Sequence, residues 1–153
     1  MQLDGIQRTH RAAQDDCPLG HQSGRFDGRF AIALKNGSIN NQVFDNILIH
    51  NGSRGSLEVD PSSQPGLQSD YNAVVNVFSD DDVFLNLTQW RAPGFDLPSV
   101  VTNAAAPFVD PAASNYHLRT GSPAINAGIA DADLPADQGG TSRPQGSGFD
   151  MGA

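Results

Sequence analysis

The sequence predicts an all-β protein, a right-handed parallel β-helix of about three to four coils that ends in an irregular C-terminal wrap and cap. Short strand-like runs recur at a step of roughly 25 residues, and helical periodicity is almost absent. The coils are expected in residues 1–87, and the wrap and cap in residues 88–153. Because 153 residues fit one domain, both parts are expected to share it.

The strands of the coils are expected where β-branched and aromatic residues gather between Gly, Asn and Asp. Six runs have this character: residues 5–9, 31–36, 41–50, 55–60, 71–78 and 82–87. The first strongly apolar residues of the leading runs follow one another at the repeat step; they are Ile6, Ile32, Leu57 and Val83. Equivalent residues of successive coils are therefore expected to stack about 4.8 Å apart.

The second part of each period keeps the same step. Asn72 follows Asn46 at this spacing, and Ala73 follows Ile47 in the same way. Stacking would place the two asparagines over one another, with their side-chain amides hydrogen-bonded in a tight bend where Asn tolerates a left-handed backbone. The sequence therefore predicts an asparagine ladder formed by Asn46 and Asn72.

The dipeptide Asn51-Gly52 allows a different interpretation. Asn-Gly is a strong signal for a two-residue β-hairpin, which would pair residues 47–50 with residues 55–60. A hairpin does not account for the longer recurrence along the chain, whereas a corner between two coils does. We therefore favour the corner over the hairpin.

The residues after position 88 are low in strand propensity and are punctuated by Pro and Gly. They contain Trp90, PFVDP at 107–111, HL at 117–118, GSPAINAG at 121–128, RP at 143–144 and DMGA at 150–153. These motifs resemble the C-terminal region of bacterial right-handed parallel β-helix proteins, including choice-of-anchor Q domain and pectate-lyase-like proteins. Asn126 departs from the pattern, since the family usually has Asp there.

The resemblance covers roughly residues 40–153 and implies a structural role for the tail. Relatives have more coils on the N-terminal side, so the chain is expected to hold the last coils and the C-terminal wrap. Arg143 is a candidate bidentate partner of Asp150 or Asp137, which would hold the final loop in place. The apolar residues expected to cover the open end of the last coil are Phe108, Val109, Leu118, Ile125 and Phe149.

The resemblance also implies an extracellular or cell-surface location and a connection with polysaccharides. Relatives with this fold include polysaccharide lyases, glycoside hydrolases, uronan epimerases and glycan-binding spikes, and their substrates lie across an outward strip of stacked strands. Here the alternation of side chains along each strand predicts two columns of side chains that point outward from the coils. These are Gln7, Ala33, Glu58 and Phe84, and beside them Thr9, Lys35, Asp60 and Asn86.

Lys35, Glu58 and Asp60 are the candidate catalytic residues of this strip. A uronan lyase or epimerase needs a base for the proton alpha to a carboxylate and a cation to stabilise the developing charge. A glycoside hydrolase would instead use two carboxyl groups, for which Glu58 and Asp60 are the nearest pair. The same three residues also fit a solvated surface ion pair that contributes under about 1 kcal/mol.

A weaker candidate is a calcium site. Asp80, Asp81 and Asp82, together with Asp70, offer the hard oxygen ligands that Ca²⁺ takes. The run lacks the pattern of an EF-hand or of a calcium-binding nonapeptide, so a solvated acidic turn is the competing interpretation. No other cofactor is predicted.

Composition limits the partners. The formal net charge of −8 argues against nucleic acid, because the field of the protein would repel phosphates. No apolar run is long enough to span a membrane, and the N-terminus lacks the apolar core of a signal peptide. The first coil is expected to be covered by residues 10–30 or to associate with a second copy of the chain, because an open coil is a template for other strands.

Two functions remain open. The first, which we favour, is a short non-catalytic β-helix module that binds a carbohydrate or another partner, or serves as a structural segment. The alternative is a carbohydrate-active enzyme, a lyase or epimerase of uronate polymers or, less favoured, a glycoside hydrolase. The chain has few coils and no recognisable catalytic motif, which favours the first function.

Overall fold

The computed structural model describes residues 30–50, 54–103, 106–130, 135–137 and 139–152. Within them the protein is all-β, as predicted, with a single short α-helix and no helix long and apolar enough to cross a membrane. The strands are β1 (Phe30–Leu34), β2 (Gln42–Phe44), β3 (Ile47–Leu48), β4 (Gly55–Val59), β5 (Gln68–Asp70), β6 (Ala73–Val74), β7 (Phe78–Asp80), β8 (Val83–Leu85), β9 (Val100–Val101), β10 (Phe108–Asp110) and β11 (Asn115–Leu118). The helical elements are η1 (Pro61–Ser63), α1 (Leu87–Arg91) and η2 (Pro111–Ala113).

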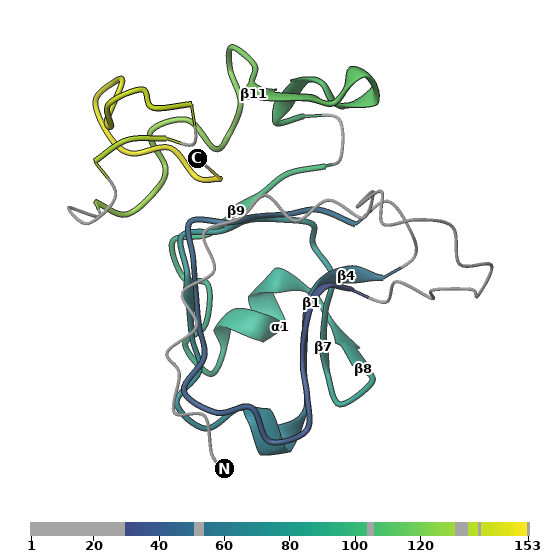
Figure 1. Ribbon diagram of the computed structural model, residues 1–153. Coiled ribbons are helices and arrows are strands. Elements are labelled where there is room, and N and C mark those ends of the chain that lie inside the picture. The colour runs from purple at the N-terminus through teal and green to yellow at the C-terminus, as the bar shows by residue number, and fades with distance from the viewer. Residues whose placement is uncertain (1–29, 51–53, 104–105, 131–134, 138, 153) are drawn as a thin grey trace.

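The chain passes through three small sheets in the same order twice (Figure 1). β1, β2 and β3 lie in three different sheets, and β4, β5 and β6 then pair in parallel with them in that order. Ile32 is in register with Leu57, Gln42 with Gln68, and Ile47 with Ala73. These registers reproduce the spacing that the sequence shows.

The parallel pairing continues beyond residue 87, where the sequence predicted the change to the C-terminal wrap. β9 pairs in parallel with β6, so that Val100 lies beside Ala73. The sheet β3–β6–β9 therefore contains three strands, and the last comes from a segment that had shown little strand propensity.

Strands β3 and β4 do not form the hairpin considered at Asn51-Gly52. β3 pairs with β6, whereas β4 pairs with β1 and β7 in another sheet. Residues 51–53 themselves lie outside the described part of the chain. The predicted strand at 5–9, with Ile6, Gln7 and Thr9, and residues 10–29 of the expected N-terminal cover lie outside it as well.

The predicted stacking of Val83 on Leu57 is wrong. Leu57 is in register with Phe78 of β7, and β8 folds back along β7 in the antiparallel direction. The reversal occurs at Asp81 and Asp82, whose φ angles of 48° and 64° are those that a tight hairpin turn requires. Val83 is consequently 61% exposed instead of pointing into the core.

Alternation along β3 and β6 creates two apolar cores, one on each face of their sheet. Leu48 and Val74 point into the space that the three sheets surround, together with Leu57, Val59 and Phe78. Ile47, Ile49 and Ala73 point the other way and pack against residues from the C-terminal part of the chain, namely Phe108, Ala124 and Met151.

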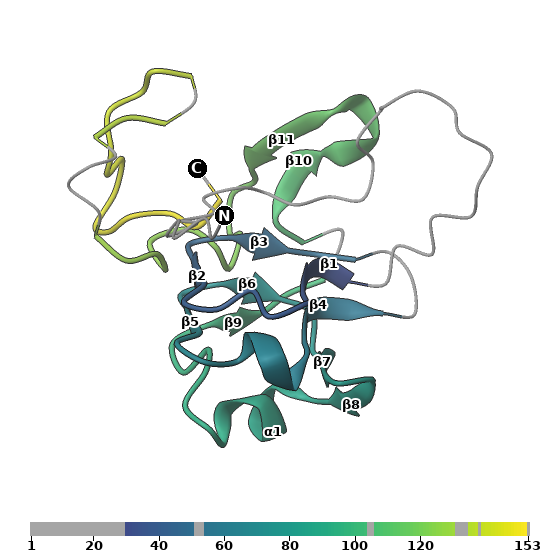
Figure 2. The same ribbon diagram turned by 60° about the horizontal axis from the view of Figure 1, so that its bottom comes forward.

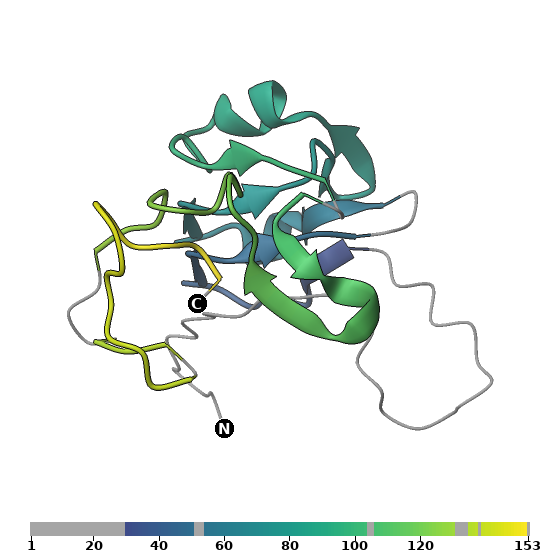
Figure 3. The ribbon, with the colours of Figure 1, turned by 90° about the horizontal axis from the view of Figure 1, so that it is seen from above.

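Helix α1 closes the end of the inner core. Asn86 and Gln89 form a capping box at its start, and the buried ring of Trp90 stacks on Phe78 with a centroid distance of 5.1 Å. The C-terminal wrap had been expected to cover this end, but Figures 2 and 3 show α1 and the C-terminal segment on opposite sides of the molecule. The wrap instead covers the side of β3 and β6 that points away from the inner core, and Val109 remains exposed.

Candidate functional site: the outer face of the first sheet

The outer face is the side of the sheet β1–β4–β7–β8 that points away from the inner core. It carries a row of side chains whose backbones are in register: Ala33, Glu58, Ser79 and Phe84. Their neighbours Leu57, Val59 and Phe78 belong to the inner core, so alternation places the row on the outside. Glu58 and Phe84 therefore share a face, as predicted, but Ser79 lies between them in the row and β8 runs in the opposite direction.

Lys35 and Glu58 form an ion pair on this face, with 2.9 Å between Nζ and Oε1. It is not a fully solvated pair, because the side chain of Glu58 is only 1% exposed while that of Lys35 is 36% exposed. Glu58 lies on β4, which is paired with β1 on one side and with β7 on the other. The hydrogen bond to Glu58 raises the pKa of Lys35, and the charges of Asp82 and Asp60 add to this effect.

Asp60, at the end of β4, holds together the neighbouring turns. Its Oδ1 accepts a hydrogen bond from Ser62 Oγ at 2.8 Å, and its Oδ2 accepts one from the backbone amide of Asn36 at 2.8 Å. The bond from Ser62, followed by that from Asn36, lowers the pKa of Asp60 to about 2. Both carboxylate oxygens are thus used in local structure.

The three acidic residues at the end of β7 form a turn. Asp80 accepts a hydrogen bond from Gln64 Nε2 at 2.7 Å, and Asp81 and Asp82 are the exposed turn residues between β7 and β8. Asp70 belongs to β5 in a different sheet, where its carboxylate accepts a hydrogen bond from the amide of Leu97. The described residues contain no group of three or more His, Cys, Asp or Glu side chains that could hold a metal ion.

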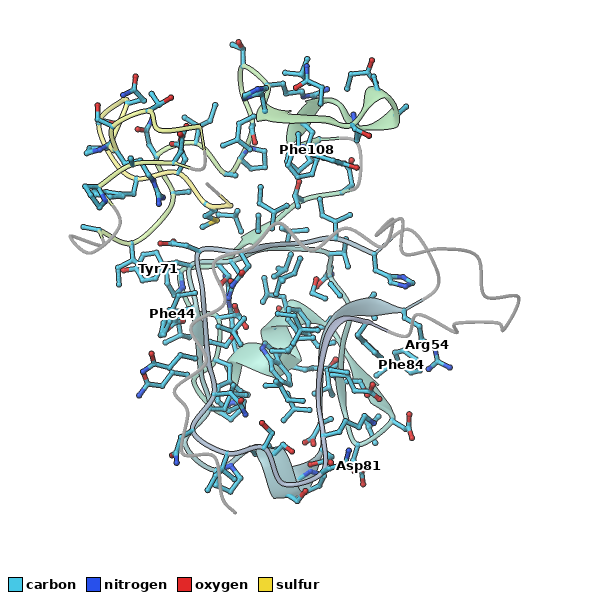
Figure 4. The ribbon with its side chains drawn as sticks, in the orientation of Figure 1. Phe44, Arg54, Tyr71, Asp81, Phe84 and Phe108 are labelled. Carbon is cyan, nitrogen blue, oxygen red and sulfur yellow. The ribbon has the colours of Figure 1, made fainter. Side chains whose placement is uncertain are left out.

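The ring of Phe84 is the main apolar feature of the outer face (Figure 4). It is 50% exposed and lies 6.2 Å from the ring of Phe30, measured between centroids. The guanidinium carbon of Arg54 lies 5.2 Å from the centroid of Phe84. Arg54 follows Asn51-Gly52-Ser53 in the sequence, where only its charge distinguishes it.

Ser79 has an unusual environment in the same row. Its side chain is fully buried, and its Oγ has no hydrogen-bond partner within the described structure. Buried hydroxyl groups are normally hydrogen-bonded, because an unsatisfied one costs free energy. A polar group that reached Ser79 between Glu58 and Phe84 would remove this cost. Sequence reasoning did not identify Ser79, which looks like an ordinary strand residue.

The predicted asparagine contact is present inside the molecule. Asn72 Oδ1 accepts hydrogen bonds from the backbone amide of Asn46 at 3.0 Å and from Asn46 Nδ2 at 3.2 Å. The left-handed backbone belongs to the preceding residues, Asp45 and Tyr71, and not to the asparagines. The chain can therefore turn one residue before each asparagine while both amides point inward.

Asp96, which sequence reasoning missed, extends this interior network. The side chain is buried, and its carboxylate accepts hydrogen bonds from Asn72 Nδ2, Ser69 Oγ, Ser99 Oγ and Trp90 Nε1. Four donors compensate for the loss of water around the carboxylate. Its sequence context, between Gly94 and Pro98, resembles an ordinary loop.

The predicted carboxylate pairing of Arg143 is replaced by other contacts. Arg143 Nη2 donates to the backbone carbonyl of Asp150 at 2.8 Å, and its guanidinium lies over the ring of Phe149. The Asp150 carboxylate accepts a hydrogen bond from the amide of Asn126, and Asp137 accepts one from the amide of Thr141. Backbone amides thus donate to these two carboxylates in place of the guanidinium.

The structure brings Lys35 and Glu58 into contact, and Asp60 follows Glu58 by two positions at the end of β4. A lysine with a raised pKa keeps its proton at neutral pH and is a poor base. A carboxyl group with a pKa of about 2 is ionised and has no proton to donate. Comparison of the chain with protein families, curated proteins and solved structures gives no match.

Proposed function

We propose that the chain is part of a right-handed parallel β-helix and that its outer face is a non-catalytic carbohydrate-binding surface of an extracellular or cell-surface protein. Two passages through three sheets in the same order, with parallel pairing at a near-constant spacing, support the β-helix. Parallel crossover connections are nearly always right-handed. The stacked side chains of Asn46 and Asn72 are the kind of interior contact that such coils make.

The half-exposed ring of Phe84 is the observation that carries the binding proposal. A large aromatic ring at the surface offers the apolar side of a sugar ring an area to cover. Contacts with Phe30 and Arg54 already restrict the ring, so less side-chain entropy is lost when a ligand binds. Lys35 and the acids around it provide polar groups for sugar hydroxyls.

Catalysis by the same strip is the weaker proposal. A lyase or epimerase would require one of the three candidates to accept a proton, and Lys35 is held in its protonated form by Glu58. Asp60 accepts hydrogen bonds from Ser62 and from the amide of Asn36, and the buried carboxylate of Glu58 is paired with Lys35. Binding requires none of these groups to change protonation.

The test is calorimetric titration of the protein with a panel of oligosaccharides that includes neutral, cationic and anionic members. Phe84→Ala is expected to weaken binding by about tenfold, which corresponds to about 1.4 kcal/mol. Val109→Ala is the matched control, because Val109 is a similarly exposed apolar residue on β10. If no member of the panel binds, or if both variants bind like the wild type, the proposed surface is wrong.

A further inference from the structure

We propose that the carbohydrate bound on the outer face carries ammonium groups, as in a polymer of amino sugars. This inference rests on the proposed function and goes beyond it by naming the chemical class of the ligand. It follows from the charges around Phe84 and from the unsatisfied hydroxyl beside it.

The positive charge of Lys35 is already neutralised. Its ammonium group donates to the buried carboxylate of Glu58 at 2.9 Å. An incoming uronate would have to compete with Glu58 for this lysine and would leave a buried carboxylate without its partner. Such a charge is costly to leave unpaired, so the pair does not offer a site for a second anion.

Among the residues that the structure describes, the remaining charges of this surface are mostly negative. Arg54 lies at the ring of Phe84, whereas Asp60, Asp80, Asp81 and Asp82 line the same end of the sheet. The charge of Asp82, in the turn between β7 and β8, helps to raise the pKa of Lys35. The charges of the described residues therefore favour cations over uronates, in the same sense as the net charge of −8.

The geometry places an aromatic surface next to this negative charge. Phe84 follows Asp82 by two positions, so their backbones are at most about 7 Å apart. One sugar ring lying on Phe84 can therefore direct an amino group toward the turn. The aromatic face and the carboxylates complement the two chemically different parts of an amino sugar.

Ser79 supplies an observation independent of the acidic residues. Its unpartnered Oγ belongs to the row between Glu58 and Phe84 and is fully buried. A ligand hydroxyl or amino group that reached Ser79 would satisfy its Oγ. An ammonium group donating there would face Glu58 on the other side of the row, which again favours a cation over an anion.

The experiment compares three oligosaccharides of equal length: glucosamine, N-acetylglucosamine and galacturonate. Titrations are done in a mildly acidic buffer of low ionic strength, where the amines are protonated. We expect glucosamine oligomers to bind at least about threefold more tightly than N-acetylglucosamine oligomers, and galacturonate oligomers to bind weakest. High salt should reduce the preference, because surface charges are screened.

Asp81→Asn tests the acidic turn and Asp110→Asn is its control. Both variants remove one negative charge; Asn tolerates the left-handed backbone of Asp81, and it can still cap η2 at position 110. Asp81→Asn is expected to weaken glucosamine binding by about twofold to fivefold, and Asp110→Asn to leave it unchanged. Equal losses in both would mean that net charge alone attracts the polymer, and would overturn the inference.

The outcomes also separate this inference from the proposed function. If N-acetylglucosamine or galacturonate oligomers bind as tightly as glucosamine oligomers, and Phe84→Ala still weakens binding, the surface binds carbohydrate but the ligand class is wrong. If none of the three oligosaccharides binds, both proposals fail.

Discussion

Asn72 is the residue whose removal should reveal most about what holds the parallel strands together. Its side chain accepts hydrogen bonds from the backbone and side-chain nitrogens of Asn46, and it donates to the carbonyl oxygen of Val43 and to Asp96 Oδ1. The residue is completely buried, so water cannot replace these contacts without entering the core. We predict that Asn72→Ala strongly lowers the free energy of unfolding.

The size of the effect can be estimated from the contacts. The backbone amide of Asn46 is left without its acceptor, which costs about 1–3 kcal/mol in a buried place. The two bonds donated by Asn72 add about 1 kcal/mol each. Together these losses predict a decrease of about 3–5 kcal/mol, a large fraction of the total stability of a single domain.

The matched control is Gln68→Ala. Gln68 and Gln42 stack at the same step along the chain, but their amide contact of 3.4 Å lies at the surface. Water can replace that contact, so Gln68→Ala is expected to change stability by no more than about 0.5 kcal/mol. The pair of variants thus compares a buried and an exposed amide contact between the same two turns of chain.

Urea unfolding, followed by the fluorescence of the single tryptophan, measures both variants. Trp90 is buried against Phe78, so its emission should report loss of the inner core. Far-ultraviolet circular dichroism provides a second signal that does not depend on Trp90. A loss of less than about 1 kcal/mol for Asn72→Ala, or equal losses for both variants, would refute the reasoning from buried hydrogen bonds.

Two further predictions concern the turns and the packing of the first sheet. The pKa of Asp60 is lowered from 3.8 to about 2, so its ionised form stabilises the protein above pH 3.8 and this contribution is lost as the pH falls through about 2. In Asp60→Asn, the free energy of unfolding is expected to fall less steeply between pH 3.8 and about pH 2 than in the wild type. An unchanged pH dependence would contradict the role given to Asp60. Gly55→Ala would drive a methyl group into the carbonyl oxygen of Val77 and should destabilise the protein by about 2 kcal/mol or more. Thermal unfolding measures this change, and a variant as stable as the wild type would show that β4 and the segment before β7 are not so closely packed.

Sequence spacing predicted the parallel pairings of β1 with β4 and of β3 with β6. Ile32 with Leu57 and Ile47 with Ala73 follow from counting residues, because parallel strands one period apart meet in register. Counting residues failed at Val83. Its separation from Leu57 in the sequence fits the step, but it lies on β8, which runs antiparallel to β7. Asp81 and Asp82 gave no Asn-Gly or Asp-Gly signal for the turn, although both adopt its backbone angles.

Part of the candidate site was also predicted from a local pattern, the alternation of side chains along each strand. Alternation correctly placed Lys35 near Glu58 and put Glu58 and Phe84 on one face. It could not predict that Glu58 is buried, since burial depends on packing between residues far apart in the sequence. Arg54 and Ser79 were missed because neither stands out by residue type, and each gains its significance from a neighbour on another strand.

The sequence alone determined the all-β character and the step between parallel strands, because both depend on local propensity and on periodicity along the chain. Helix α1 and its capping box at Asn86 and Gln89 were not predicted, since Asn86 was expected on a strand. Only the tertiary structure decided that Trp90 closes the inner core, that Asp96 joins the amide network, and that the C-terminal segment packs beside β3. These features depend on contacts between residues far apart in sequence, where packing and compensation of buried polar groups outweigh local preference.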